Sequence, residues 1–360
     1  MCTFTHMSIT EGISLAAACT AGSRLRRRLT VAVAALLGVT LLLGGCGSDD
    51  GTPASDAKQD GETSAFPVTL AQKLGDVTIE AEPQRVVALD FPSADNAIAL
   101  GVIPIGMAEV TYVEGGVMAW TKTALGDHKP EIFNVDNGFP FETIAKLNPD
   151  LILATNTYPL IADHWDKLNA IAPVVGHVEE PFVDPWQQAV SQVGKALGRS
   201  AEAQQLIADV ESSIAEARTE HPEFAGKTVS LFRYLGTDGL YVISTNEDHS
   251  IKLLRQLGFH GVTDTVVNMP GASERRVLVS PERYADLEAD LVVGTGRVGI
   301  EGLAELAKHP TFAQLPATTR GAYIPIPVGR STSMVQPSAL SLPFALDELV
   351  PEFAKALADQ

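Results

Sequence analysis

The stretch that decides the fold runs from Asp184 to His221 and reads DPWQQAVSQVGKALGRSAEAQQLIADVESSIAEARTEH. Its apolar residues recur at steps of three and four, which places them in one stripe along a helix. Asp184 as cap and Pro185 in the first turn mark a helix start. Gly198 and Ser200 permit a break. The spacing therefore predicts a short helix, then a longer one from Ala201 to about Glu220.

Strand-like runs alternate with helical patterns on both sides of this stretch. RVVALD (85–90) and FETIAKLNPDLILAT (141–155) precede it, while TVSLFRYLG (228–236) and SPERYADLEADLVVGT (280–295) follow it. Such alternation predicts an α/β fold with mainly parallel sheets. We expect a first lobe at 67–184, a long interlobe helix or spine at 185–221 and a second lobe at 222–360. The alternative is an ordinary covering helix in one large domain.

The amino terminus has the pattern of an export signal. A basic patch from Arg24 to Arg28 precedes the apolar run LTVAVAALLGVTLLLGG, which is short for a membrane span. The run ends in Leu-Gly-Gly-Cys46, which resembles the lipobox of bacterial lipoproteins. The resemblance implies removal of residues 1–45 and a diacylglyceryl group on the Cys46 thiol. The polar segment 46–66 is predicted to be a flexible tether to the outer face of the cell membrane.

Charge and cysteine content exclude several classes of function. Removing residues 1–45 takes away four arginines and one glutamate, which lowers the net charge from −18 to −21. Nucleic-acid binding needs a basic footprint, so no nucleic-acid partner is expected. The cysteines are Cys2, Cys19 and Cys46, so the body after the tether has neither a disulfide nor a thiolate metal site.

The sequence contains an internal repeat at an offset of 140 residues. The offset pairs Glu142 with Glu282, each in the expected first turn of a helix, and Asp150 with Asp290. A carboxylate in a first helical turn is stabilised by the helix dipole. One hypothesis is that both lobes present equivalent acidic side chains on one outer face. The other is simple repetition of the fold.

From about Pro83 to Leu349 the chain resembles the periplasmic binding proteins for ferric siderophores, haem and cobalamin, which serve ABC importers. The resemblance rests on PQRVVALD, FETIAKLNPDLILAT, PWQQAVSQVGKALGRSAEAQQLI, VSPERYADLEADLVVG and LSLPFALDEL, found in the family's order. It implies two Rossmann-like lobes joined by a rigid helix, with ligand in the cleft between them. It also implies that Glu142 and Glu282 dock onto arginines of the membrane permease.

The expected ligand is an iron(III)–siderophore, and no covalent cofactor or directly bound metal is expected. Such chelates are rich in acceptor oxygens and require arginine donors and aromatic rings. The cleft of an α/β lobe is built from loops after strand ends. Asp136 stands where some hydroxamate-binding relatives have an arginine, which shifts the expected charge contacts to the second lobe. The candidates at strand ends are Phe91, Tyr112, Trp120, Tyr158, Arg233, Tyr234, Arg275, Arg276, Arg297 and Arg330.

Three other functions remain as alternatives at this point. A haem or cobalamin receptor of the same family is the first, with a tyrosine or histidine available as a haem ligand. A zinc- or manganese-binding protein is disfavoured because the histidines form no HxH or HxxxH pattern. A secreted α/β enzyme is disfavoured too, since the GxGxxG at 294–299 lacks the later acidic strand end of a dinucleotide site. The prediction is thus a monomeric, lipid-anchored receptor and not an enzyme.

Overall fold

A computed structural model of the chain describes residues 65–157, 160–272 and 275–358. The predicted signal segment, the lipid acceptor Cys46 and nearly all of the predicted tether lie outside these described residues. Within them, no helix combines the length and the apolar character that a membrane crossing requires. The fold is therefore that of the body that begins near residue 65.

The first lobe is built on five parallel strands in the order β5-β4-β3-β6-β7. Every residue of β3 and β6 is buried, as expected for a parallel sheet covered by helices on both faces. An antiparallel ribbon of β1 (Val68–Leu70) and β2 (Val77–Ile79) precedes the sheet. The other elements are β3 (Val86–Ala88), α1 (Phe91–Ala99), β4 (Gly106–Ala108), η1 (Glu114–Gly116), α2 (Ala119–Leu125), β5 (Glu131–Phe133), α3 (Phe141–Lys146), β6 (Leu151–Ala154), α4 (Leu160–Asn169) and β7 (Val174–Gly176).

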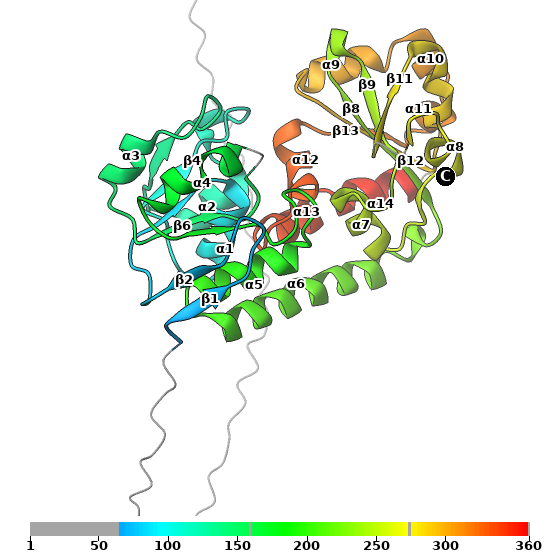
Figure 1. Cartoon of the computed structure of the whole chain (residues 1–360). Helices are drawn as coiled ribbons and strands as arrows, with labels where there is room; N and C mark the ends of the chain where they lie inside the picture. Colours follow the sequence, from blue (N-terminus) through cyan, green and yellow to red (C-terminus); the bar gives the residue numbers. More distant parts are fainter. Residues whose placement is uncertain (1–64, 158–159, 273–274, 359–360) are drawn as a thin grey trace, which may run out of the picture. The chain divides into compact units, whose positions relative to one another are not determined.

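Two helices then lead from the first lobe to the second, as the sequence predicts. They are α5 (Trp186–Ala196) and α6 (Ser200–Glu220). Gly198 lies between them with φ 69°, a left-handed conformation that glycine adopts without penalty. The long green helix α6 packs against α5 and also contacts α7 (His249–Gln256) and η2 (Pro222–Phe224) of the second lobe (Figure 1). The predicted helix break is confirmed.

The prediction that Asp184 caps the first of these helices is wrong. Its carboxylate accepts hydrogen bonds from the backbone N–H groups of Val178 (2.6 Å) and Glu180 (3.0 Å). Pro185 occupies the cap position of α5, and no side chain bonds the helix end. The chain after β7 turns back over Asp184, so the carboxylate closes that turn instead of starting the helix.

The close packing of α5 on α6 leads to a first prediction. A Cβ atom on Gly194 would lie 2.3 Å from the Cβ of Ala203 on α6. Gly194→Ala should therefore lower the free energy of unfolding by about 1–3 kcal/mol, although alanine favours helix by about 1 kcal/mol. Urea unfolding followed by circular dichroism measures this. Ala208→Ser on the exposed face of α6 is the control, expected within about 0.5 kcal/mol of the parent. A more stable Gly194→Ala variant would contradict the packing.

The second lobe has a mixed sheet in the order β11-β9-β8-β12-β13, with β10 beside the start of β8. The strands β10, β8, β12 and β13 are parallel, and β9 and β11 run antiparallel to their neighbours. Together the two sheets confirm the predicted α/β fold of two lobes. The elements are η2 (Pro222–Phe224), β8 (Thr228–Tyr234), η3 (Gly236–Asp238), β9 (Leu240–Ile243), α7 (His249–Gln256), β10 (Gly261–Val262), α8 (Asp264–Val267), β11 (Arg276–Val279), η5 (Pro281–Leu287), β12 (Leu291–Thr295), α9 (Gly299–Leu306), α10 (Pro310–Ala313), α11 (Pro316–Thr319), β13 (Tyr323–Pro325), α12 (Val328–Val335), α13 (Ser341–Glu348) and α14 (Val350–Ala358).

The internal repeat in the sequence corresponds to equivalent positions in the two lobes. Asp150, just before β6, accepts hydrogen bonds from the backbone N–H groups of Gln84 and Arg85, both at 2.8 Å. Asp290, just before β12, accepts one from the backbone N–H of Thr228 at 2.7 Å. Each aspartate thereby fixes the start of the central strand next to its own, β3 or β8. The two lobes thus repeat one construction.

The glycines of the GxGxxG sequence serve strand packing. A Cβ on Gly296 would lie 1.9 Å from the backbone oxygen of Tyr234 on the neighbouring strand β8. A Cβ on Gly294 would lie 2.7–2.8 Å from the rings of Phe232 and Tyr323. Gly299 begins α9 with φ 71°. Close packing at Gly294 and Gly296 and the left-handed backbone at Gly299 account for all three glycines through the fold.

A second connection between the lobes comes from late in the chain. Asp95 of α1 is fully buried and accepts hydrogen bonds from Trp120 Nε1 (2.7 Å), Thr121 Oγ1 (2.5 Å) and Ser338 Oγ (2.6 Å). These four residues form what we name the Asp95 cluster. Phe344 of α13 packs on the Trp120 ring with the ring centroids 5.0 Å apart. The segment between α12 and α13 is thus bonded to the helices of the first lobe.

Candidate ligand-binding site

A cavity of about 280 Å³ lies where the loops after several parallel strands converge. Asp90, Tyr112, Asp136 and Asn156 line it from the loops after β3, β4, β5 and β6, and Arg297 lines it from the loop after β12. Phe91 lines it as well, as the sequence predicts. Clefts outside the carboxyl ends of strands are the usual ligand sites of α/β folds. Residues of both lobes therefore meet at this cavity.

Asp90 holds the first-lobe wall of the cavity together. Its carboxylate caps α1 by accepting a hydrogen bond from the Ser93 N–H (2.8 Å) and also accepts from Thr157 Oγ1 (2.7 Å) and the Asn156 N–H (3.1 Å). Burial raises the pKa of this carboxyl, an effect that the same hydrogen bonds oppose. The group thereby ties the loop after β6 to the start of α1.

Tyr112 and Arg297 meet across the cavity. The Arg297 guanidinium carbon lies 5.7 Å from the centroid of the Tyr112 ring, within the range of a cation–π interaction. Burial raises the pKa of the Tyr112 phenol, while a hydrogen bond with Thr332 of α12 and the nearby guanidinium groups oppose the shift. An aromatic ring of one lobe is thus held against an arginine of the other.

Arg233 lies close to both Arg297 and Arg276. Arg233 of β8 is opposite Thr295 of β12, two residues before Arg297. Tyr241 of β9 is paired with Arg233 on one side and with Leu278 of β11 on the other, so these three side chains share one face of the sheet. Arg276 is two residues before Leu278 in β11 and therefore projects from that same face. Burial lowers the pKa of Arg233, and the positive charges of Arg276 and Arg297 lower it further. We name Arg233, Arg276 and Arg297 the basic cluster.

Other predicted site residues do not join this group. Trp120 is buried in the Asp95 cluster, with 6% of its surface exposed. Arg330 of α12 donates hydrogen bonds to the backbone oxygen of Glu348 and to Glu352 Oε1, both at 2.8 Å. Arg275 is exposed beside β11 with φ 68°. Tyr158 lies outside the described residues, as does Cys46.

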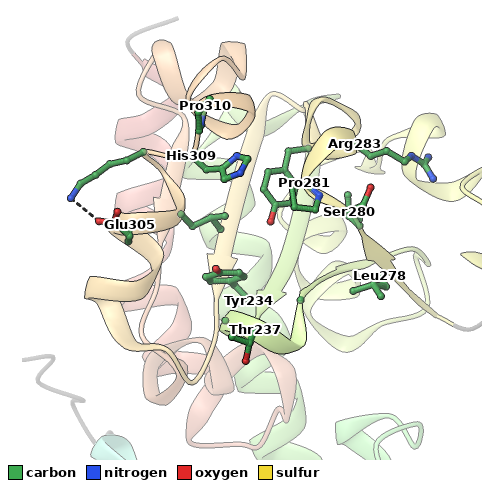
Figure 2. Close-up of a pocket in the computed structure, with 15 residues that line it drawn as sticks. Tyr234, Thr237, Leu278, Ser280, Pro281, Arg283, Glu305, His309 and Pro310 are labelled. Atoms are coloured by element: carbon green, nitrogen blue, oxygen red, sulfur yellow. Dashed lines mark hydrogen bonds and ion pairs between the residues drawn. The ribbon is translucent and has the colours of Figure 1, made fainter.

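Tyr234 lines a second, larger cavity of about 810 Å³ in the second lobe (Figure 2). All of its lining residues come from positions 234–310, so the first lobe contributes nothing to it. Its charged side chains already have partners: Lys308 pairs with Glu305 at 2.9 Å and Arg283 with Asp286 at 2.8 Å. This cavity is larger, but it offers no unpaired charge of the kind found in the basic cluster.

The two predicted docking glutamates occupy equivalent places. Glu142 is in the first turn of α3 and Glu282 in the first turn of η5, and both are exposed. The second element is a 3-10 helix and not the α-helix that the sequence pattern predicts. Pro281 and Arg283, on either side of Glu282, line the larger cavity.

Sequence reasoning missed several residues of the site. Asp90, Thr157 and Gln336 line the cavity, and Thr332 bonds Tyr112. Of these residues, only Asp90 could have been identified from the sequence, because it stands at the end of a predicted strand and immediately before a helix. Among the described residues, no three or more His, Cys, Asp and Glu side chains are grouped as a metal ion would need.

Comparison with known proteins supports one family. Residues 86–327 match the model of a family described as periplasmic binding protein. The probable siderophore-binding lipoprotein YfiY of Bacillus subtilis (strain 168) is 27% identical over 227 residues, which cover 61% of this chain and 63% of that protein. The alignment thus spans less than two thirds of the relative's length.

Two solved structures share the fold. A periplasmic solute binding protein from Mycobacterium smegmatis str. MC2 155 is 32% identical with a TM-score of 0.70, covering 81% of this chain and 98% of that one. PiaA of Streptococcus pneumoniae TIGR4, solved in complex with ferrichrome, is 24% identical with a TM-score of 0.68 and covers 81% and 99%. The second similarity concerns the fold alone.

Proposed function

The chain belongs to the periplasmic binding protein family, and from that premise we propose that it is the substrate-binding lipoprotein of an ABC importer. It captures an iron(III)–siderophore in the cavity between the lobes and delivers it to the membrane permease. The observation that carries this proposal is the basic cluster beside Tyr112, at the ends of strands from both lobes. The name of the relative YfiY agrees with it.

The chemistry of the site is that of recognition. Guanidinium groups donate several hydrogen bonds in a fixed plane and match the oxygen-rich surface of a ferric chelate. The Tyr112 ring offers a flat apolar face beside them. Phe91 and Tyr112 from the first lobe, with Arg233, Arg276 and Arg297 from the second, are the ligand contacts that we propose. The iron remains bound by the siderophore, so the protein needs no metal ligand of its own.

Membrane attachment and delivery complete the proposal. Cleavage before Cys46 and lipidation of its thiol anchor the chain on the extracytoplasmic face of the membrane. Segment 46–66 then serves as the tether, lobes at 67–184 and 222–360 flank the spine at 185–221, and the protein acts as a monomer. Glu142 and Glu282 dock onto the permease, one from each lobe. No catalytic step is part of this function.

Within the part of the chain that the structure describes, no particular contact favours the haem or cobalamin alternative. Among the tyrosines of the described residues, Tyr112 is hydrogen-bonded with Thr332 and lies within cation–π range of Arg297. Tyr234 lines the larger cavity of the second lobe. A free phenolate beside an open coordination position is the arrangement that haem ligation through tyrosine requires. A siderophore needs only the donors that the cavity already presents.

Titration of intrinsic fluorescence tests this function. Trp120 packs on Phe91, a cavity residue, with ring centroids 6.2 Å apart. A bound ferric chelate should therefore quench tryptophan emission in a saturable way in the purified full-length lipoprotein. Haem, cobalamin and iron-free siderophores serve as comparison ligands. Saturable quenching by haem or cobalamin, with none by any ferric chelate, would refute the proposal, as would chemical turnover of a ligand.

A further inference from the structure

We propose that the chelate bound in the cavity carries net negative charge and lies with its anionic side against Arg233, Arg276 and Arg297. This inference rests on the proposed function and narrows it. It distinguishes chelates whose catecholate or hydroxycarboxylate groups leave the iron complex anionic from neutral trihydroxamate complexes. It also gives the ligand one orientation between the lobes.

The basic cluster has no carboxylate partner among the described residues. Among the described residues, none of its three arginines makes an ion pair or a hydrogen bond with a carboxylate. Other arginines of the second lobe do: Arg320 lies 2.6 Å from Glu288 and Arg330 lies 2.8 Å from Glu352. Arg276 and Arg297 are exposed and Arg233 is partly buried, so their guanidinium groups are available to an anionic ligand.

Like charges are brought together in the basic cluster. Arg233 is partly buried, and Arg276 and Arg297 are close enough to disfavour its charged form. Like charges at short range destabilise a folded protein unless an opposite charge is added. A neutral ligand would leave that repulsion in place and would remove water from the guanidinium groups. An anionic ligand would relieve the repulsion and accept their hydrogen bonds.

The first-lobe wall of the cavity carries the opposite charge. Glu109 and Asp136 line the cavity from the first lobe. Glu109 accepts a hydrogen bond from Asn134 Nδ2 (3.0 Å), and Asp136 accepts one from Thr111 Oγ1 (2.7 Å). An anionic group placed there would be repelled by both carboxylates. The negative groups of the chelate therefore face the second lobe, and its amide or amine donors face Glu109 and Asp136.

Because the protein carries a net negative charge, only positive charges close to the ligand can attract an anionic chelate. Without residues 1–45 the chain carries a charge of −21, so its average field repels anions. Salt at physiological ionic strength screens that field beyond about 8 Å. Attraction of an anionic chelate must then come from charges in direct contact with it. Arg297 supplies such a charge in the wall of the cavity of about 280 Å³, and Arg233 lies close to both Arg297 and Arg276.

Three iron(III) probes of different charge test the proposal on the full-length lipoprotein. Ferric enterobactin and ferric citrate are anionic, whereas ferrichrome is neutral. We expect at least one anionic probe to bind about tenfold or more tightly than ferrichrome, and its affinity to fall as salt is raised. If ferrichrome binds as tightly as the anionic probes, or more tightly, this inference fails while the proposed function stands. If no ferric chelate binds, the proposed function itself fails.

Charge-changing variants then locate the contact. Arg233→Gln, Arg276→Gln and Arg297→Gln should each weaken the anionic probe by about 10- to 100-fold, the effect of losing one charged hydrogen bond. Asp136→Asn should instead tighten it, because a repelling charge is removed. Arg218→Gln, an exposed position on α6, is the matched control and should change nothing.

Thermal melts establish that each variant is folded, and ferrichrome affinity provides the internal reference. The inference is overturned if the three arginine variants bind the anionic probe with parent affinity. It is equally overturned if Asp136→Asn weakens the anionic probe as much as the arginine variants do. That second result would mean that Asp136 and the basic cluster pair with one another when the lobes close.

Discussion

Reversing the charge of both Glu142 and Glu282 to lysine is expected to abolish uptake of the ferric chelate by cells. The affinity of the purified protein for the chelate should stay within about threefold of the parent, because both side chains are exposed and neither lines the cavity between the lobes. Each carboxylate projects from the first turn of a helix, α3 or η5, at equivalent positions of the two lobes. We propose that a cationic permease surface contacts both carboxylates.

The measurement is accumulation of a radiolabelled ferric chelate in cells whose only copy of the receptor is the variant. Glu216→Lys combined with Glu220→Lys applies the same change of charge to exposed positions of α6 and serves as the control. Uptake should be near background in the first double variant and near normal in the second. Normal uptake with both Glu142 and Glu282 reversed would remove the docking assignment.

Replacing Asp95 by alanine is expected to lower the free energy of unfolding by about 3–5 kcal/mol. The substitution leaves the Trp120 indole N–H and the hydroxyl groups of Thr121 and Ser338 without an acceptor in a fully buried position. It also loosens the link between α1 and the segment before α13. Asp209→Ala on the exposed face of α6 should cost less than about 0.5 kcal/mol and is the control. If Asp95→Ala lowered the free energy of unfolding by no more than the control does, the buried hydrogen bonds would contribute little to stability.

The same carboxyl should make stability depend on pH. Burial raises the pKa of Asp95 to about 6, although its three hydrogen bonds oppose the shift. Because this folded-state pKa exceeds the unfolded value of 3.8, its contribution is fully present below pH 3.8 and is lost as the pH rises through about 6. In Asp95→Asn that component of the slope between pH 4 and 6.5 should disappear. Urea unfolding at several pH values measures the slope, and an unchanged slope would contradict the assignment.

Features encoded by neighbouring residues could be predicted from the sequence. Gly198 ends one helix by adopting a conformation that disfavours other residues, and the structure has the break at that place. The match of Asp150 with Asp290 proved to be a shared way of fixing the central strand of each lobe. In both cases the physical cause lies within one element or is repeated between the lobes.

Features that depend on distant partners could not be predicted in this way. Arg233 and Tyr234 are adjacent in β8 and project to opposite faces, so they could not serve one site as the sequence analysis assumed. The alternation itself was predictable, but which face meets the other lobe was not. Arg330 looked free because its partners on α14 and at the end of α13 follow about one to two dozen residues later.

The hydrogen bond between Asp95 and Ser338 is a stronger example of a contact that the sequence could not predict. The two residues are 243 positions apart, and neither has a neighbour that signals the other. Trp120 was predicted to contact ligand because large aromatic rings often do. Its ring instead packs between Phe91 and Phe344, and its N–H bonds Asp95. A polar buried partner contributed by the far end of a chain leaves no local pattern to recognise.

The contact of residues 338–344 with α1 and α2 has a consequence for folding during synthesis. A nascent chain that ends at His221 already contains every strand of the first sheet and both spine helices. It still lacks Ser338, Ala339 and Phe344, which bond Asp95 and Asn96 and cover Trp120. The early half can therefore reach its final packing only after nearly the whole polypeptide has left the ribosome, and a fragment cut at the spine would expose an incomplete hydrophobic interior.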